Sequence, residues 1–261
     1  MKRHFEILFL ILTFASCKTY ETSLRKTEST NIVITSSISS ENKEVDDLVL
    51  PYKKGIDSVM NTVLNQSKTE MAIGSPEGLL GNFVCDLVLE VGNEIYKKLD
   101  SNNDADFSLL NNGGLRTSLP KGEITRRKIF ELMPFENQLV VVTLSPEKML
   151  ELFQYIGKKT TTATGRKNGV PISGNVKVEL VGTTPKVAII NGQKIRGRNY
   201  KVITSDYLAN GGDKMYFFVN PVKIEKLGIK LRDAIIQHIE VEKEKGNKIN
   251  ASLDKRIEYV K

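Results

Sequence analysis

The chain has 261 residues, of which 40% are hydrophobic and 26% charged, and a formal net charge of +7. This length allows one sizeable domain with its own core. The positive charge is spread along the sequence rather than gathered in one stripe, so we expect a solvated basic surface and no nucleic-acid partner. Two cysteines and two histidines leave few candidates for thiol, disulfide or histidine chemistry.

Residues 1–17 have the pattern of an export signal. Two basic residues precede an apolar segment between Phe5 and Ala15, which is too short to cross a membrane, and small residues then lead into Cys17. A cysteine at this place resembles a bacterial lipoprotein signal, in which Cys17 carries lipid and becomes the mature N-terminus. We therefore expect an exported lipoprotein, anchored to a membrane in the bacterial periplasm or at the cell surface. A secreted protein with an incidental cysteine is the alternative.

Residues 18–44 are rich in Ser, Thr, Glu and Asn and contain few large apolar side chains. Such a segment cannot bury enough apolar surface to fold, so we expect a disordered tether. The folded domain is then expected to span residues 45–261. We find no internal repeat in it.

The folded part mixes helical and strand patterns without a regular βαβ rhythm. Apolar residues recur at helical spacing over Leu48–Leu64 and over Leu79–Leu99, and the second helix is apolar on a broad face, which is typical of a buried helix. Cys85 lies in this second helix and is expected to be a buried, inert thiol. The remaining predicted helices are Arg126–Met133 after the N-cap Thr125, Pro146–Ile156 after the N-cap Ser145, and Leu231–Lys243. The predicted strands are Ala105–Leu110, Leu139–Leu144, Val176–Leu180, Val187–Ile190, Tyr200–Thr204 and Ile257–Val260. This mixture favours an α+β fold with a mixed β-sheet flanked by helices.

Two loops rich in asparagine and glycine follow predicted strands. One is Asn111-Asn112-Gly113-Gly114-Leu115-Arg116, and the other is Asn210-Gly211-Gly212-Asp213. Glycines let the backbone turn sharply and approach a ligand, and an arginine beside such a turn can form paired hydrogen bonds with a phosphate or carboxylate. A single cluster of this kind also marks ordinary turns. Its recurrence after a second strand favours binding loops.

Four short motifs occur in one order along this part of the chain. They are Gly81-Asn82-Phe83-Val84-Cys85-Asp86, Asn111-Asn112-Gly113-Gly114-Leu115-Arg116, Pro134-Phe135-Glu136-Asn137 and Tyr207-Leu208-Ala209-Asn210-Gly211-Gly212-Asp213. Together they resemble the C-terminal, substrate-binding domain of the bacterial and animal 5′-nucleotidases. The resemblance covers about Leu48 to Val260. It implies an α+β domain that recognises nucleotides.

The resemblance also implies binding roles for individual residues. Asn111 and Arg116 would hold the phosphate. Phe135 and Tyr207 would stack on either side of the base, and Asn137 would hydrogen-bond its edge. Asp213, with Gly211 and Gly212 in the same loop, would hold the ribose hydroxyls. The chemistry suits these roles, because aromatic faces stack on any base and a carboxylate accepts hydroxyl protons. The alternatives are a core position for Phe135 and a structural helix-start role for Tyr207, and the order of the motifs favours binding.

The sequence departs from the family's pattern in several places. The departures are a missing arginine in Ile73–Glu77, Glu136 in place of a glycine, Tyr207 in place of a phenylalanine, and Lys214 and Met215 in place of a glycine and an aromatic residue. The missing positive charge at the phosphate could come from Lys214, or from Arg166 and Lys167 in the glycine-rich loop 165–174.

A larger departure concerns catalysis. The resemblance implies a cleavage reaction performed by a separate metallophosphatase domain, whose two metal ions need aspartate, asparagine and several histidine ligands. The mature chain would contain one histidine, His238, and no motif for a metal site, an activated nucleophile or a phosphate-binding loop of the Gly-Lys-Ser/Thr type. We therefore expect no catalytic residue, metal ligand or cofactor in this chain, and divalent metals on a partner metallophosphatase.

Two functions fit this pattern. In the first, the chain is the nucleotide- or nucleoside-recognition half of a split nucleotidase, which acts in nucleotide hydrolysis and catabolism together with a separate metallophosphatase chain. In the second, it is a free-standing surface lipoprotein that binds nucleosides or nucleotides and has no catalytic role. A domain kept only as a structural or adhesive unit is a third alternative.

Overall fold

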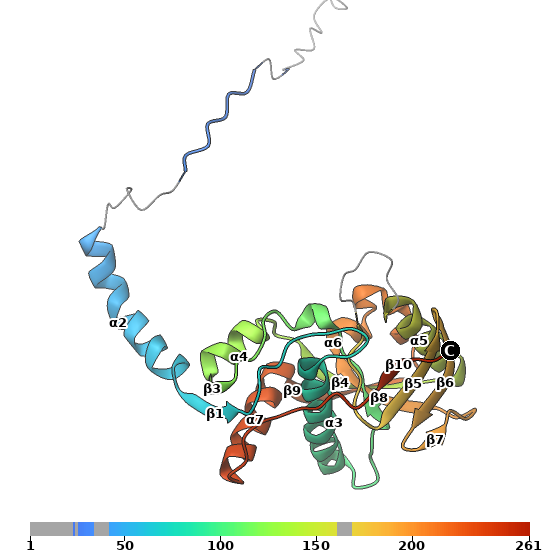
Figure 1. The fold of residues 1–261 in the computed structure, drawn as a ribbon. Coiled ribbons are helices and arrows are strands. Elements are labelled where there is room, and N and C mark those ends of the chain that lie inside the picture. Colours follow the sequence, from blue (N-terminus) through green and yellow to red (C-terminus); the bar gives the residue numbers. More distant parts are fainter. Residues whose placement is uncertain (1–22, 24–25, 34–41, 161–168) are drawn as a thin grey trace, which may run out of the picture. The chain divides into compact units, whose positions relative to one another are not determined.

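The structure is a computed structural model that describes residues 23, 26–33, 42–160 and 169–261. Within these residues, the sheets and the hydrophobic core belong to the unit Leu50–Lys261 (Figure 1). Cys17, Arg166 and Lys167 lie outside the described residues, so the expectations for them stay predictions. No helix in the described ranges is long and apolar enough to cross a membrane.

A four-stranded sheet of order β2-β8-β4-β9 forms the centre of this unit. Its strands are β2 Phe107–Ser108, β8 Tyr200–Ser205, β4 Gln138–Leu144 and β9 Lys223–Lys230. β2 is parallel to β8, whereas β4 is antiparallel to both β8 and β9. The sheet is therefore mixed, as predicted. Sequence analysis missed β9 because three lysines, a glutamate and a glycine interrupt its apolar pattern.

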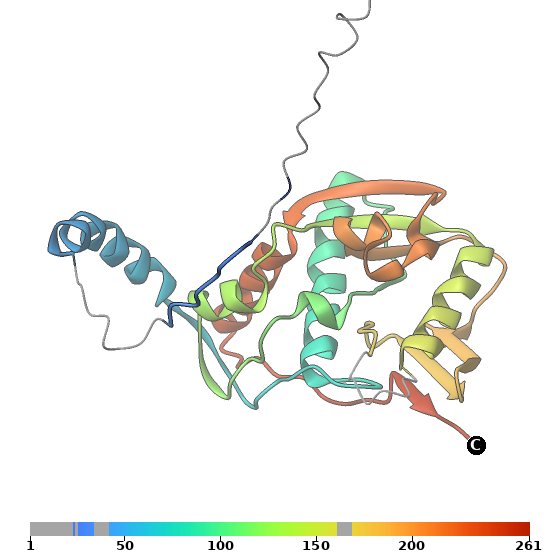
Figure 2. The same ribbon diagram turned by 90° about the horizontal axis from the view of Figure 1, so that it is seen from above.

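Helices cover both faces of the central sheet. They are α3 Leu79–Leu99, α4 Arg126–Leu132, α5 Pro146–Thr160, α6 Asp206–Ala209 and α7 Leu231–Glu244, with the short 3₁₀ turns η1 Asn112–Gly114, η2 Gly212–Lys214 and η3 Tyr216–Phe218. Figures 1 and 2 show α3 and α7 side by side on one face, with α5 on the other side.

Two hydrophobic cores lie on the two faces of this sheet. Successive side chains of β4 alternate between them, because a strand's side chains point to opposite faces. Leu139 and Val141 join the core formed with α3 and α7, whereas Val140 and Val142 join the core formed with α5. Burial on both faces explains why β4 is a continuous apolar segment in the sequence.

A second four-stranded sheet has the order β10-β5-β6-β7 and contacts α5. Its strands are β10 Ile257–Tyr259, β5 Val176–Val181, β6 Thr184–Ile190 and β7 Gln193–Lys194. One mixed sheet was predicted, whereas the strands at Val176, Val187 and Ile257 form this separate sheet, in which β10 pairs in parallel with β5. The α+β prediction with mixed strand pairing is confirmed.

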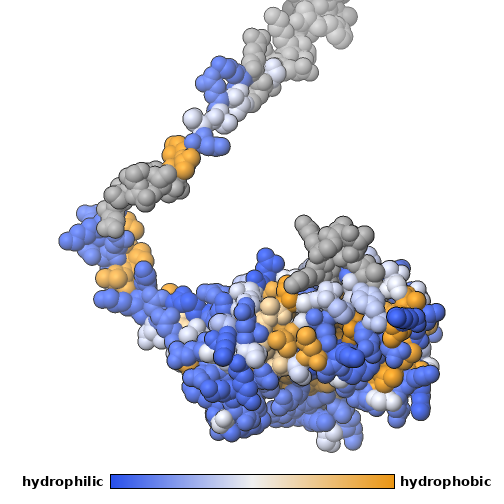
Figure 3. Space-filling view, viewed as in Figure 1, coloured by the Kyte–Doolittle hydropathy of each residue, from blue (hydrophilic) through white to orange (hydrophobic). Residues whose placement is uncertain are grey.

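The helix predicted over Leu48–Leu64 starts and ends earlier. α2 spans Lys43–Met60, and the chain then forms β1, Val63–Ser67, which pairs with β3, Gly122–Thr125. The strand places Leu64 in the core. α2 itself has no buried residue. Hydrophobic surface, in orange, is visible along this helix in Figure 3. Its exposed large apolar or aromatic side chains are Val45, Leu48, Val49, Leu50, Tyr52, Ile56 and Val59.

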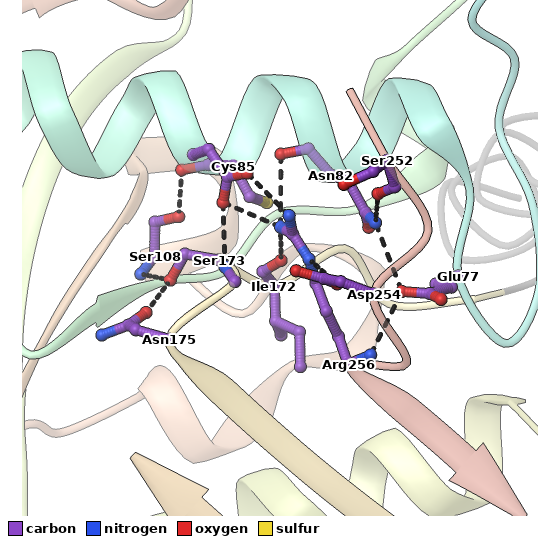
Figure 4. Close-up of polar contacts among 12 residues, drawn as sticks. Glu77, Asn82, Cys85, Ser108, Ile172, Ser173, Asn175, Ser252, Asp254 and Arg256 are labelled. Carbon is purple, nitrogen blue, oxygen red and sulfur yellow. Dashed lines mark hydrogen bonds and ion pairs between the residues drawn. The ribbon is translucent and has the colours of Figure 1, made fainter. Parts of the chain in front are cut away.

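A polar cluster attaches the C-terminal segment to the start of α3 (Figure 4). The side chain of Arg256 is 3% exposed and donates hydrogen bonds to both carboxylate oxygens of Asp86, at 2.8 and 2.6 Å, and to Asp254 at 2.8 Å. It also donates to the carbonyl of Ile172 at 2.8 Å. Glu77 accepts the backbone N–H groups of Lys255 and Arg256. A buried guanidinium needs such partners because burying an unpaired charge is costly.

Cys85 lies next to this cluster on α3 and is fully buried, as predicted. Burial raises the pKa of its thiol to about 12. The thiol is therefore protonated at neutral pH, which is the unreactive form.

Candidate functional site

The pairing of the central strands brings the predicted binding segments to one edge of the sheet. Asn111 follows β2 and Tyr207 follows β8, and these two strands are parallel, so their carboxyl ends lie at the same edge. Asn137 precedes β4, which is antiparallel to β8 with Leu139 opposite Ser205. The start of β4 therefore lies beside the end of β8.

A cavity of about 380 Å³ opens at this edge. This volume lies within the roughly 300–1,000 Å³ that is typical of small-molecule sites. Its lining residues are Asn111, Gly113, Gly114, Arg116, Phe135, Asn137, Tyr207 and Asp213. The residues singled out in the sequence thus come together, except for Gly211 and Gly212. Phe135 is 40% exposed and Tyr207 47% exposed, so neither aromatic side chain is a core residue.

Asp213 is the centre of a hydrogen-bond network in this cavity. Its Oδ2 accepts a hydrogen bond from Nδ2 of Asn111 at 2.7 Å, and its Oδ1 accepts one from the hydroxyl of Tyr207 at 3.0 Å. The hydroxyl of Tyr155 donates to the backbone carbonyl of Asp213 at 2.9 Å. Burial and the nearby Asp213 carboxylate raise the pKa of Tyr155, so this hydroxyl keeps its proton at neutral pH. The network joins the two asparagine–glycine loops.

Gly211 and Gly212 precede Asp213 and do not line the cavity themselves. Gly211 has a φ of +87°, a left-handed conformation that glycine adopts at little cost. A Cβ atom on Gly212 would lie 2.5 Å from Cε1 of the Tyr207 ring. A side chain at position 212 would therefore clash with that ring, so Gly212 leaves the room that Tyr207 occupies.

Asp206 is a site residue that sequence analysis missed. Its Oδ1 accepts hydrogen bonds from the backbone N–H of Tyr207 at 2.8 Å and from that of Gln138 at 3.1 Å. One carboxylate oxygen therefore connects the segment that carries Asn137 to the segment that carries Tyr207. The only indication in the sequence was an acidic residue directly after the N-cap Ser205. The side chain of Ser205 caps α6 by accepting a hydrogen bond from the N–H of Leu208.

Glu136, which departs from the family's pattern, positions the turn that carries Phe135. It forms ion pairs with Lys230 at the end of β9 and with Arg232 at the start of α7. Hydrogen bonds from Lys230 and Arg232 lower the pKa of Glu136 to about 2. The Arg232 guanidinium also lies over the ring of Phe130, 4.2 Å from its centroid. Glu136 is thus matched by two cations on neighbouring elements.

Arg116 supplies positive charge to the cavity. Its Nη1 donates to the carbonyl of Gly113 at 3.2 Å, and it forms no ion pair with any residue in the described part of the chain. Asn112, in the same loop, is buried, and its side chain donates a hydrogen bond to the carbonyl of Gly74 at 3.1 Å. This bond joins the asparagine loop to the segment Ile73–Glu77. Lys214 does not line the cavity.

No grouping of three or more His, Cys, Asp or Glu side chains that could hold a metal ion occurs among the residues that the structure describes. His238 lies on α7, with its Nδ1 3.3 Å from Oε2 of Glu90. Burial lowers the pKa of His238, and the Glu90 carboxylate opposes this shift.

The structure is an α+β domain with a cavity of small-molecule size, and sequence comparison identifies its family. The model of the family described as 5′-nucleotidase, C-terminal domain, matches residues 59–220. The chain belongs to this family.

Two relatives found by sequence comparison are longer than this chain. A trifunctional nucleotide phosphoesterase of Bacillus subtilis is 24% identical over 84% of the chain, and an apyrase of Tabanus yao is 28% identical over 50% of it. The chain covers 15% and 26% of their respective lengths.

Solved structures share the fold. A 5′-nucleotidase precursor from Thermus thermophilus matches 84% of the chain with a TM-score of 0.61 and 21% identity, and the NAD nucleotidase of Haemophilus influenzae matches 85% with a TM-score of 0.56 and 14% identity. The chain covers 44% and 42% of these two proteins. At this level of identity the likeness concerns the fold alone.

The Glu136 ion pairs predict a stability change in acid. The folded pKa of about 2 is lower than the ordinary value of 4.5, so the stabilisation is complete above pH 4.5 and is lost as the pH falls from 4.5 towards 2. We expect Glu136→Gln to have a lower melting temperature than the wild type at pH 7, and the difference to vanish near pH 2. Thermal unfolding from pH 7 to pH 2 measures this, with Glu70→Gln as the control for removing an exposed carboxylate. A difference that does not change with pH would contradict the assignment.

Proposed function

We propose that the cavity binds the nucleoside part of a nucleotide. In this proposal the base lies between Phe135 and Tyr207, the ribose hydroxyls bind Asp213, and the phosphate lies at Arg116. One observation carries the proposal: two exposed aromatic side chains, a carboxylate and an arginine without an ion pair in the described chain line the same cavity. Membership of the 5′-nucleotidase C-terminal domain family supports it.

The chemistry of these side chains suits a nucleotide in each of its parts. Stacking of a base on an aromatic ring contributes about 1–3 kcal/mol and is tolerant of base identity. The amide of Asn137 offers one donor group and one acceptor to the edge of a base. The planar guanidinium of Arg116 can pair with two phosphate oxygens. Asn111, which already donates to Asp213, lies beside the place proposed for the phosphate and the sugar.

We further propose that phosphate-ester cleavage is performed by a separate metallophosphatase, with divalent metals bound to that partner. Such metals polarise the phosphate and supply the attacking hydroxide. This domain would hold the nucleotide so that its phosphate is in line with that hydroxide, which is a positioning role. The names of the relatives, a nucleotide phosphoesterase and an apyrase, support an assignment to nucleotide hydrolysis and catabolism. The alternative is a binding protein without a catalytic partner.

We also propose that the protein is exported and held at a membrane by lipid on Cys17. The signal-like residues 1–17 support this, as does the similarity to a protein of Listeria monocytogenes named as a cell wall protein, 25% identical over 84% of this chain. Mass spectrometry of the protein from membranes should show an N-terminus at Cys17 with attached acyl chains, and Cys17→Ser should remove the membrane association. An unlipidated mature protein cut at another residue would contradict the proposal.

Loss of the Phe135 ring should weaken nucleoside binding. We expect Phe135→Ala to raise the dissociation constant for adenosine about 5- to 150-fold, which corresponds to the loss of one stacking contact. Calorimetric titration measures this. Tyr52→Ala, which removes an exposed aromatic ring from α2, is the control and should bind as the wild type does. Equal affinities of Phe135→Ala and the wild type would rule out a base at this ring.

A chain that only positions the nucleotide should affect phosphate release only when it is mixed with the metallophosphatase. The isolated chain should not release phosphate from AMP with any divalent metal, whereas adding it to a metallophosphatase encoded beside it should raise kcat/KM for AMP. Arg116→Ala should abolish this increase because the phosphate is then no longer held. Arg196→Ala, which removes an exposed arginine outside the cavity, should leave it unchanged.

Two results would contradict the split-enzyme proposal. Turnover of AMP by the isolated chain would mean that it contains its own catalytic site. Tight nucleoside binding without stimulation of the metallophosphatase would favour the free-standing binding protein instead.

A further inference from the structure

α2 carries a continuous apolar face that is exposed to solvent. The residues of this α2 apolar face recur at alternating steps of four and three residues: Val45, Val49, Tyr52, Ile56 and Val59. Each of these side chains is at least 49% exposed, and no residue of α2 is buried. Steps of four and three are the spacing by which two helices pair in a coiled coil. A helix of this length is only marginally stable in water without packing, so we expect this face to have a partner.

The charges along α2 indicate which partner fits. After Lys43, three acidic residues come first and two adjacent lysines follow: Glu44, Asp46 and Asp47, then Lys53 and Lys54. A further acidic residue, Asp57, is paired with Arg127 at 2.5 Å. Asp46 and Lys53 each directly follow a residue of the α2 apolar face, so both border the same edge of it. Neither forms an ion pair with any residue in the described ranges.

An antiparallel second copy of α2 fits this apolar face. With the two helices overlapping over residues 45–56, Val45 lies opposite Ile56 of the second copy, and Val49 lies opposite Tyr52 of the second copy. A two-fold axis relates the copies, so each contact occurs twice and the apolar faces cover each other. The proline inside α2 lies on the polar side of the helix and leaves these contacts intact.

The same overlap brings opposite charges together. Asp46 lies beside Lys53 of the second copy, and the two-fold axis repeats this pair. In a parallel arrangement the residue beside Lys53 would be Leu48, which has no charge. A membrane surface suits α2 less well, because helices that lie on membranes carry lysines and arginines over their polar face, whereas α2 has more acidic residues than lysines. Charge complementarity therefore favours a second copy.

We propose that α2 is a self-association surface, through which two copies of this chain pair in antiparallel orientation. The interface joins the two α2 apolar faces and is flanked by the two pairs of Asp46 with Lys53. One short helix from each copy makes a small interface, so the dimer forms reversibly. In the proposed lipoprotein, two copies held at one membrane meet at a raised local concentration, which favours the dimer.

Disulfide cross-linking tests the orientation. The tested chain begins at residue 18, which retains every described residue and leaves one native thiol, that of the buried Cys85. In Val45→Cys/Ile56→Cys the two cysteines are about 16 Å apart along one helix, so they can bond only to a second copy. We expect a covalent dimer. Asp47→Cys/Ser58→Cys has the same spacing on the polar side of α2 and is the matched control, which should yield at least about fivefold less dimer.

Reversal of charge tests the pairing, with sedimentation equilibrium of the same chain giving the dissociation constant of the dimer. Lys53→Glu places two acidic residues side by side twice and should raise this constant at least about fivefold. Asp46→Lys/Lys53→Glu restores opposite charges and should return it to within about twofold of the wild type. Lys54→Glu makes the same change of charge on the polar side and is the control, with an unchanged constant.

Several results would overturn the inference. One is a monomer at every concentration, with no more cross-linking of the paired cysteines than of the control. Another is cross-linking of Val49→Cys, because this residue faces itself only in a parallel pair. A dimer that survives Ile56→Asp would use another surface. Binding to vesicles of phosphatidylethanolamine and phosphatidylglycerol that Ile56→Asp abolishes would assign the face to a membrane instead. None of the substituted residues lines the cavity, so these outcomes are independent of nucleotide binding.

Discussion

The parallel pairing of β2 with β8 is the constraint on which the site depends. Phe107 lies opposite Val202 and Ser108 opposite Ile203, so the loops that follow these two strands leave the sheet at the same edge. The hydrogen bond between Asn111 and Asp213, residues far apart in the chain, is a direct consequence of this pairing. The antiparallel β4 then adds the segment with Phe135 and Asn137 from the other direction. The cavity thus lies at the carboxyl ends of two parallel strands, which is also where ligands bind in open α/β sheets.

Several buried or charged side chains hold the segments at this edge of the central sheet in place and do not themselves line the cavity. Asp206 joins the starts of β4 and α6 through one carboxylate oxygen. Glu136 fixes the turn of Phe135 to β9 and α7 through two cations. Asn112 secures the asparagine loop to the segment before α3. Such support limits the conformational freedom of the segments that carry Phe135 and Tyr207, and pre-organisation of this kind lowers the entropy that a site loses on binding.

Much of the fold could be predicted from the sequence wherever a local pattern and tertiary packing agree. The helix over Leu79–Leu99 has the predicted bounds because its apolar face is both helical in spacing and buried. The strands β1, β3 and β9 were missed because they are short or charged and depend on partners distant in the chain. The cavity residues were recognisable from the order of their motifs. Asp206 and the cation pair on Glu136 were not, because a carboxylate in a sequence does not reveal which backbone amide or cation it will face.

The central claim is that a nucleotide base lies between Phe135 and Tyr207. A crystal structure of the mature chain with AMP tests it most directly. The account predicts adenine between these two rings, ribose oxygens within hydrogen-bond distance of the Asp213 carboxylate, and the phosphate next to Arg116. Density for AMP at another surface, with the space between the two rings empty at saturating nucleotide, would contradict it.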